Sequence, residues 1–143
     1  YFSLILNSFC YKIIICGKGL PEEMNELKTY ADKNIIYTGF ISDIATYYKA
    51  ADIFLNPVLS GGGVKTKIVE AISYGTTVIS TETGAAGMVK EVCGEKLQIV
   101  AYDSWESFER KIIKNKSIKN QTPQEYYNYY FYPNIIERII RLV

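Results

Sequence analysis

Five short apolar runs, rich in β-branched residues, alternate along this chain with segments of helical period. The runs cover residues 12–16, 34–39, 52–57, 76–81 and 96–101. Hydrophobicity that is almost continuous along a run is typical of a strand covered by helices on both faces, as in a parallel sheet. The alternation of the two patterns predicts an α/β fold with a doubly wound, Rossmann-like parallel sheet.

The segments between the runs carry signals for helix ends. Pro21 and the two glutamates after it open a predicted helix that extends to about residue 31. Ser42 and Asp43 precede a second helix, and Gly75 is placed to end a third. A fourth helix, over 105–115, follows Asp103 or Ser104 in the same way.

The C-terminal segment differs in composition from the rest. Six aromatic residues lie within 126–132, and an apolar and basic helix is predicted to begin near Pro133. We expect one domain over residues 1–143, with 122–143 as a helical tail. Three interpretations of the tail stay open: packing against another domain, an ordinary core or surface helix, and peripheral contact with a membrane interface.

Composition excludes several classes of function. The chain has 143 residues, 48% of them hydrophobic, and a net charge of +1. This length is sufficient for one domain with a core, and the near-neutral charge gives no bulk attraction to nucleic acid, so no nucleic-acid partner is expected. The chain contains no histidine. Nucleophiles activated by histidine and most zinc sites are therefore excluded.

The cysteines indicate the cellular location of the protein, and the first residues indicate whether the protein is longer than this chain. Cys10, Cys16 and Cys93 are widely spaced and form no metal-binding pair, so we expect reduced thiols in a cytoplasmic protein. No apolar run reaches membrane-spanning length, and no signal peptide is visible. The chain begins at Tyr1 with a pattern typical of the middle of an amphipathic helix, from which we expect a longer protein.

The stretch SGGGVKTK combines glycines with lysines before a helix. Gly61, Gly62 and Gly63 would let the backbone approach a ligand closely, although three glycines are unfavourable for helix stability. The free N–H groups of the first helical turn, expected at about Val64 to Thr66, can bind an anion. Lys65 and Lys67 add positive charge to the same turn. The spacing does not match a Walker A loop.

Helical spacing after the glycines predicts two faces. One face is expected to pack on the sheet, and the other carries Glu70 toward the anion-binding turn. A carboxylate accepts hydrogen bonds only, so Glu70 would hold hydroxyl groups, such as those of a ribose, beside the phosphates. The alternative is a solvated ion pair of Lys67 with Glu70, which leaves the glycines unexplained. The sheet face comprises Val64, Ile68, Ala71 and Ile72, and the other face comprises Thr66, Lys67, Glu70 and Tyr74.

Two further loops follow predicted strands, where ligands bind in open parallel sheets. Gly17 and Gly19 form a glycine turn after the first strand, but Glu22 occupies the third position of a dinucleotide fingerprint, so that motif fails. The loop 81–88 contains Gly84 and Gly87 and could close over a ligand. A plain strand-to-helix turn is the alternative for each loop.

Taken together, these motifs resemble a known family. The segments IIICGKGLPEEMNEL and NIIYTGFISDIATYYKAADIFLNPVLSGGGVKTKIVEAISYGTTVISTETGAAGM are similar to the C-terminal, donor-binding half of GT-B glycosyltransferases. The closest likeness is to the retaining, nucleotide-sugar-dependent transferases of the "glycosyl transferases group 1" type. The likeness covers residues 12 to about 101.

The resemblance implies a role for each matching residue. Glu70 corresponds to the second glutamate of the family's Glu-x7-Glu element, which binds the ribose hydroxyls of the donor. The backbone from Gly62 to Lys65 corresponds to the loop that cradles the diphosphate. Phe40 and Ile41 correspond to the segment that lines the base. Gly17 and Gly19 correspond to the first nucleotide-side turn.

The sequence departs from the family pattern at two places. The first glutamate of Glu-x7-Glu falls at Gly62, so no catalytic residue is assigned, and a basic pair after the first strand is not recognisable. The sequence also contains no Asp-x-Asp element. Helix dipole, amides and lysines would then stabilise the leaving diphosphate, and we expect neither metal nor cofactor.

The resemblance implies a hexosyltransferase-like enzyme that transfers a sugar from a nucleoside diphosphate sugar to an acceptor hydroxyl. Its acceptor would bind to an N-terminal domain of the same full-length protein, which we expect to lie outside this chain. Residues 1–143 alone are then expected to be inactive. The alternatives are a non-transferase of the same fold, such as an epimerase or phosphorylase, and a catalytically inactive nucleotide-sugar-binding domain.

Overall fold

The computed structural model describes residues 11–19, 34–61, 63–101, 105–115 and 121–141. The chain divides into two compact units, residues 1–44 and 45–143. Unit 1 contains two parallel strands, β1 (Ile13–Cys16) and β2 (Ile35–Gly39), in which Ile13 pairs with Ile35 and a bulge follows Ile15. The helix expected over 21–31 lies outside the described residues.

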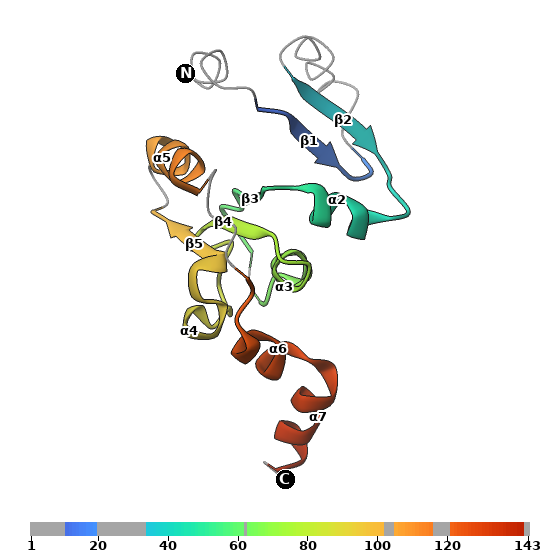
Figure 1. The fold of residues 1–143 in the computed structure, drawn as a ribbon, viewed down its shortest axis with the longest axis vertical. Coiled ribbons are helices and arrows are strands. Elements are labelled where there is room, and N and C mark those ends of the chain that lie inside the picture. Colours follow the sequence, from blue (N-terminus) through green and yellow to red (C-terminus); the bar gives the residue numbers. More distant parts are fainter. Residues whose placement is uncertain (1–10, 20–33, 62, 102–104, 116–120, 142–143) are drawn as a thin grey trace. The chain divides into compact units, whose positions relative to one another are not determined.

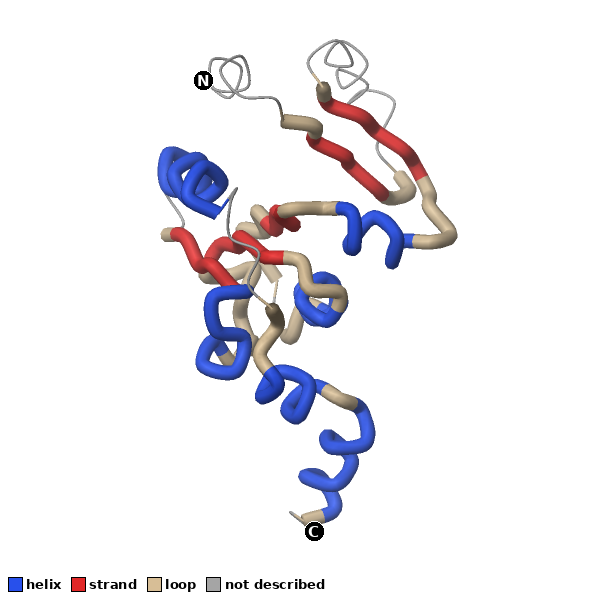
Figure 2. Tube along the Cα trace, viewed as in Figure 1, coloured by secondary structure: helices blue, strands red, loops and turns tan. Residues whose placement is uncertain are grey.

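Unit 2 is built on three parallel strands in the order β3-β4-β5, which are β3 (Ile53–Asn56), β4 (Thr77–Thr81) and β5 (Leu97–Val100). Helices lie between and after the strands, as Figures 1 and 2 show. They are α2 (Ile44–Ala50), α3 (Thr66–Ser73), α4 (Lys90–Cys93) with a short 3-10 turn (Gly94–Lys96), α5 (Trp105–Asn115), α6 (Gln124–Tyr130) and α7 (Tyr132–Ile140).

The predicted strands agree with the observed ones to within one or two residues, and the predicted α/β class is confirmed. All five residues of β4 are buried. This burial follows from the central position of β4, because α3 and α5 both pack on it, on opposite sides in Figure 1. The helix between β4 and β5 is shorter than the others, with four residues.

One part of the core of unit 2 lies between β4 and α5. Ile79, Val100 and Phe108 form a buried cluster, and Ile53, Leu55 and Ile112 pack against it. These residues come from all three strands and from one face of α5. The cluster therefore joins the sheet to its covering helix on this side.

Helix α3 ends in a Schellman motif. Gly75 has φ 85°, a conformation that favours glycine. The N–H of Gly75 donates to the carbonyl of Ile72 (2.9 Å), and the N–H of Thr76 donates to that of Ala71 (3.0 Å). The ammonium of Lys96, a residue only 3% exposed, donates to the carbonyl of Gly75 at 2.5 Å. Burial lowers the pKa of Lys96. The prediction that Gly75 ends this helix is confirmed.

The two tail helices differ in burial. Tyr126 of α6 is 1% exposed and belongs to the core of unit 2. In α7, by contrast, Tyr132, Ile136 and Ile140 recur at every fourth residue, and each is exposed. No helix in the described ranges is both long and apolar enough to cross a membrane.

The buried thiol of Cys93 makes stability depend on pH. Burial, assisted by the Glu91 carboxylate, raises the pKa of Cys93 from 9.0 to about 11. As pH rises through this interval, the unfolded chain loses this proton while the folded chain keeps it, so the free energy of unfolding falls. Urea unfolding of the wild type and of Cys93→Ala at pH 8 to 11 measures this effect. The stability advantage of the wild type should narrow with rising pH, and a constant advantage would contradict the prediction.

Candidate functional site

In unit 1 the two loops at the carboxyl ends of the strands are joined by hydrogen bonds. The N–H of Gly17 donates to the carbonyl of Gly39 (2.8 Å), and the hydroxyl of Tyr37 donates to the carbonyl of Gly17 (2.7 Å). Gly17, Gly19 and Gly39 all have positive φ. The glycine turn predicted after the first strand therefore exists, and it lies against the start of the 39–41 segment.

The segment predicted to line a base presents an exposed ring. Phe40 is 66% exposed, and the ammonium of Lys18 lies 4.4 Å from the centroid of its ring. Ile41 beside it is half-buried. A solvent-facing ring of this kind can stack on a planar ligand group. The structure thus brings Gly17, Gly19, Phe40 and Ile41 together within unit 1.

In unit 2 the two described glycines of the run are exposed and have conformations that favour glycine. Gly61 has φ 104° and Gly63 has φ 77°, and both are exposed. Gly62 lies outside the described residues. The ammonium of Lys65 approaches Gly61 closely, because a Cβ added there would lie 3.3 Å from it. The positive charge of Lys65 is therefore held beside the loop.

Helix α3 follows the loop with an N-terminus that no side chain caps. Lys65 is its N-cap residue and makes no side-chain cap hydrogen bond. The first backbone N–H groups of a helix have no partner within the helix, so those of Thr66 and Lys67 point out of this end. Both residues are exposed. These N–H groups are placed where the sequence predicts an anion to bind, and the anion-binding role itself stays a prediction.

The two predicted faces of α3 are confirmed with one exception. Ile68, Ala71 and Ile72 are each 0% exposed, and the members of the opposite face, including Glu70, are exposed. The prediction for Val64 is wrong, since Val64 is 50% exposed and precedes the helix. Because α3 begins at Thr66, the helical N–H groups start about two residues later than expected.

A buried polar cluster at the ends of β3 and β4 was not predicted. The side-chain amide of Asn56 donates to the hydroxyl of Ser80 (3.0 Å), and the N–H of Gly84 donates to the hydroxyl of Thr81 (2.9 Å). Thr81 in turn donates to the carbonyl of Val58. The cluster links the segment after β3 to the loop after β4. Its sequence signal is a polar residue at the end of each of two apolar runs.

The loop 81–88 packs against Val64, the residue directly after the glycine run. Gly87 has φ 79°, and a Cβ added to it would lie 3.0 Å from Cγ2 and 3.3 Å from N of Val64. The backbones of the two loops therefore meet at this point. The N–H of Ala85 also donates to the carbonyl of Thr81 (2.9 Å), which keeps the loop compact.

A cavity of about 810 Å³ lies elsewhere in unit 2, at the amino ends of β3 and β4. Ligands bind at the carboxyl ends of the strands in open parallel sheets. The cavity is therefore on the opposite edge of the sheet from α3's N-terminus, and we do not assign it to the site. Its lining includes Lys49, Asp52, Thr77, Lys96 and Tyr127.

Potential metal ligands do not cluster in the described part of the chain. No group of three or more histidine, cysteine, aspartate or glutamate side chains there could hold a metal ion.

The family model "Glycosyl transferases group 1" matches residues 2–115 of the chain. The chain belongs to this family. A comparison with curated proteins finds no match.

Two solved structures of Anabaena Alr3699/HepE, a protein crystallised with UDP in one case and with UDP and glucose in the other, share the fold. The TM-scores are 0.68 and 0.69, and the sequence identity is 16% in both. The matches cover 92% and 97% of this chain but 40% and 43% of the HepE chains. The chain therefore spans about two fifths of the length of these relatives.

The tight packing at Gly84 gives a test of the polar cluster. A Cβ at this position would lie 2.5 Å from both Asn56 Nδ2 and Ser80 Oγ, so Gly84→Ala should lower the free energy of unfolding by about 1–3 kcal/mol. The matched control is Gly84→Ala together with Ser80→Ala, which removes one of the three clashing atoms, the third being Thr81 Oγ1 at 2.9 Å. In urea unfolding, Gly84→Ala should lower the free energy of unfolding by less in the Ser80→Ala protein than in the wild type. Equal costs in both backgrounds would contradict the packing described.

Proposed function

We propose that this chain is the donor-binding domain of a glycosyltransferase, which binds a nucleoside diphosphate sugar. In the full-length protein the sugar is transferred to an acceptor hydroxyl, with retention and without a metal ion. The family membership supports a transferase, and the fold shared with HepE supports one half of a GT-B architecture. HepE binds UDP, which supports a nucleotide donor here.

The uncapped N-terminus of α3, directly after the positive-φ glycines, carries the proposal. The diphosphate would lie on the N–H groups of Thr66 and Lys67, with the backbone of Gly61 and Gly63 beside it. When the sugar–oxygen bond breaks, negative charge develops on the leaving diphosphate. The helix end and the ammonium groups of Lys65 and Lys67 would stabilise that charge.

Other residues are proposed to bind the ribose and the base of the donor. Glu70 lies one turn along α3 on the exposed face, where its carboxylate can accept hydrogen bonds from ribose hydroxyls. Phe40 and Ile41, with the turn at Gly17 and Gly19, would line the base. The absence of an Asp-x-Asp element from the sequence supports transfer that needs no metal.

Gly62 supports one alternative, a domain that binds the donor without turnover. The family's first glutamate is missing at this position. A transferase with Gly62 must therefore activate the sugar through other groups, whereas an inactive relative needs none.

The proposal includes an N-terminal, acceptor-binding domain and a cytoplasmic location. The exposed stripe of Tyr132, Ile136 and Ile140 on α7 supports packing against that domain. Peripheral contact with a membrane is a competing role for the same stripe, since Tyr and Ile beside Arg141 suit an interface.

Substitution of Glu70 tests the ribose role. Glu70→Ala should raise the dissociation constant for UDP about tenfold, because two hydroxyl groups lose a charged acceptor, while stability changes little at an exposed position. Isothermal titration calorimetry measures the affinity. Glu125→Ala, which removes another exposed helical glutamate of unit 2, should bind UDP as the wild type does. Unchanged affinity in Glu70→Ala would exclude this role.

Turnover by the full-length protein tests the reaction. With UDP-sugars as donors, release of UDP should be measurable and should persist in EDTA, because helix N–H groups and lysines replace a metal ion. Loss of activity in EDTA would refute the metal-independent mechanism. Binding without any UDP release would instead favour the inactive domain.

A further inference from the structure

Hydroxyl groups of the C-terminal segment contact the backbone of α3. Tyr126 donates to the carbonyl of Val69 (2.6 Å), and Tyr127 donates to that of Ser73 (3.1 Å). Just before α6, the hydroxyl of Thr122 donates to the carbonyl of Ile72 (2.7 Å). Three residues from the tail thus bind carbonyls within residues 69–73 of α3, which lie 50 or more residues earlier in the chain.

The same tail helix also holds the segment that follows β4. The N–H of Val89, the N-cap residue of α4, donates to the hydroxyl of Tyr130 (2.9 Å). That hydroxyl lies 3.9 Å from the sulfur of Met88. Helices α4 and α6 lie side by side in Figure 1, and their contact buries Cys93. The end of the loop 81–88 is therefore fixed by a tyrosine from the tail.

The rings of α6 connect these two sets of contacts. The centroids of Tyr126 and Tyr130 are 4.8 Å apart. Both hydroxyls are protonated at neutral pH, as is usual for tyrosine, and burial raises the pKa of each further. One rigid aromatic pair therefore joins α3 to the loop 81–88.

Helix α3 and the loop 81–88, which the tyrosine pair contacts, both lie next to the glycine run. Gly87 of the loop packs on Val64, and α3 begins two residues after Val64. The contacts of Tyr126 with α3 and of Tyr130 with Val89 therefore act on the two segments that flank Val64, in addition to the packing of α3 on β4. Neither Tyr126 nor Tyr130 is among the residues that we assign to nucleotide binding.

We propose that Tyr126 and Tyr130 are positioning residues for the donor site, which hold the N-terminus of α3 and the glycine run in the arrangement that binds a diphosphate. This inference rests on the proposed function. Tyr130 is the sharper test position, because Tyr130→Phe removes only the oxygen that accepts the N–H of Val89. Val89 then has a backbone donor without its partner, which loosens the end of the loop beside Val64.

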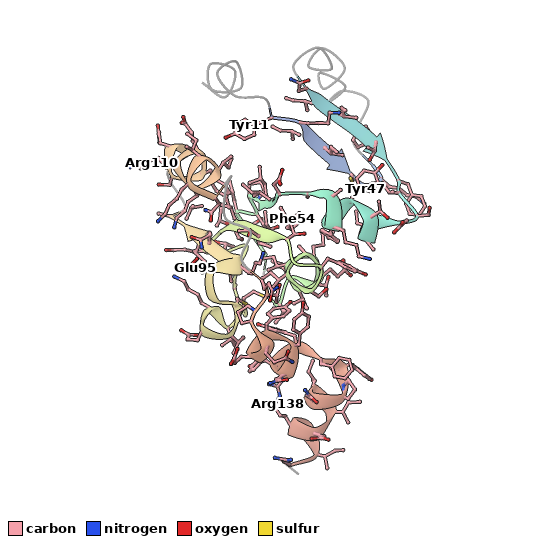
Figure 3. All side chains as sticks on the ribbon, viewed as in Figure 1. Tyr11, Tyr47, Phe54, Glu95, Arg110 and Arg138 are labelled. Carbon is pink, nitrogen blue, oxygen red and sulfur yellow. The ribbon has the colours of Figure 1, made fainter. Side chains whose placement is uncertain are left out.

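The control substitution is Tyr129→Phe, in the neighbouring residue of α6. The ring of Tyr129 faces α7, where the guanidinium carbon of Arg138, labelled in Figure 3, lies 4.0 Å from its centroid. This variant loses the same atom from the same helix without touching Val89. Differences between the two variants therefore report the Tyr130–Val89 contact.

UDP binding by calorimetry gives the functional result. Tyr130→Phe should raise the dissociation constant for UDP about five- to tenfold, and Tyr129→Phe should leave it within about twofold of the wild type. Uridine, which lacks the diphosphate, should bind all three proteins equally in NMR titrations. A general loss of folded protein would lower the affinities for UDP and for uridine by the same factor. The inference would therefore be overturned if Tyr130→Phe lowers both affinities equally, or if it leaves the affinity for UDP unchanged.

Amide hydrogen exchange tests the positioning without any ligand. In Tyr130→Phe, exchange at residues 84–89 and at Val64 should accelerate relative to Tyr129→Phe. Unchanged exchange would overturn the inference even if UDP binds. If the wild type fails to bind UDP, the proposed function fails, and accelerated exchange would then show that the structural connection itself is correct.

Discussion

The packing of α3 on the central strand of unit 2 is the interaction on which the rest of the structure depends. Ile68, Ala71 and Ile72 have no exposed surface, and burying each isoleucine side chain is worth about 1.5–3 kcal/mol. Because the chain must enter this helix from the end of β3, the packing fixes where the glycine run lies. It also fixes which residues face outward. Thr66, Lys67 and Glu70 reach solvent because their neighbours at helical spacing do not.

Much of this arrangement could be predicted from the sequence, because it depends on local periodicity. The strands, the two faces of α3 and the glycine that ends it all follow from patterns within a few residues. A parallel sheet then brings the carboxyl ends of its strands to one edge, so the loops at that edge could be named as candidate sites. The positive charge near the α3 N-terminus required no tertiary information, whereas the first residue of the helix was expected about two residues too early.

The parts that sequence reasoning missed depend on distant residues. Val64 has an apolar side chain at a helical spacing, but it lies in the loop before the helix and is 50% exposed despite its contact with Gly87. Asn56 and Ser80 are polar residues in apolar runs, and their burial is explained by hydrogen bonds with each other and, for Ser80, with backbone carbonyls. The tail tyrosines could be recognised as unusual in composition. Their partners in α3 and before α4 could not be identified, since no local pattern specifies them.

Lys96 changes the electrostatics of α3 at a distance from the glycines. An eight-residue helix is only about 12 Å long, so its negative pole partly cancels the field of its positive pole outside the first turn. The ammonium of Lys96, held on the carbonyl of Gly75, compensates the negative pole with a built-in cation. Solvent around the opposite pole consequently experiences a more positive potential than the same helix would generate in isolation.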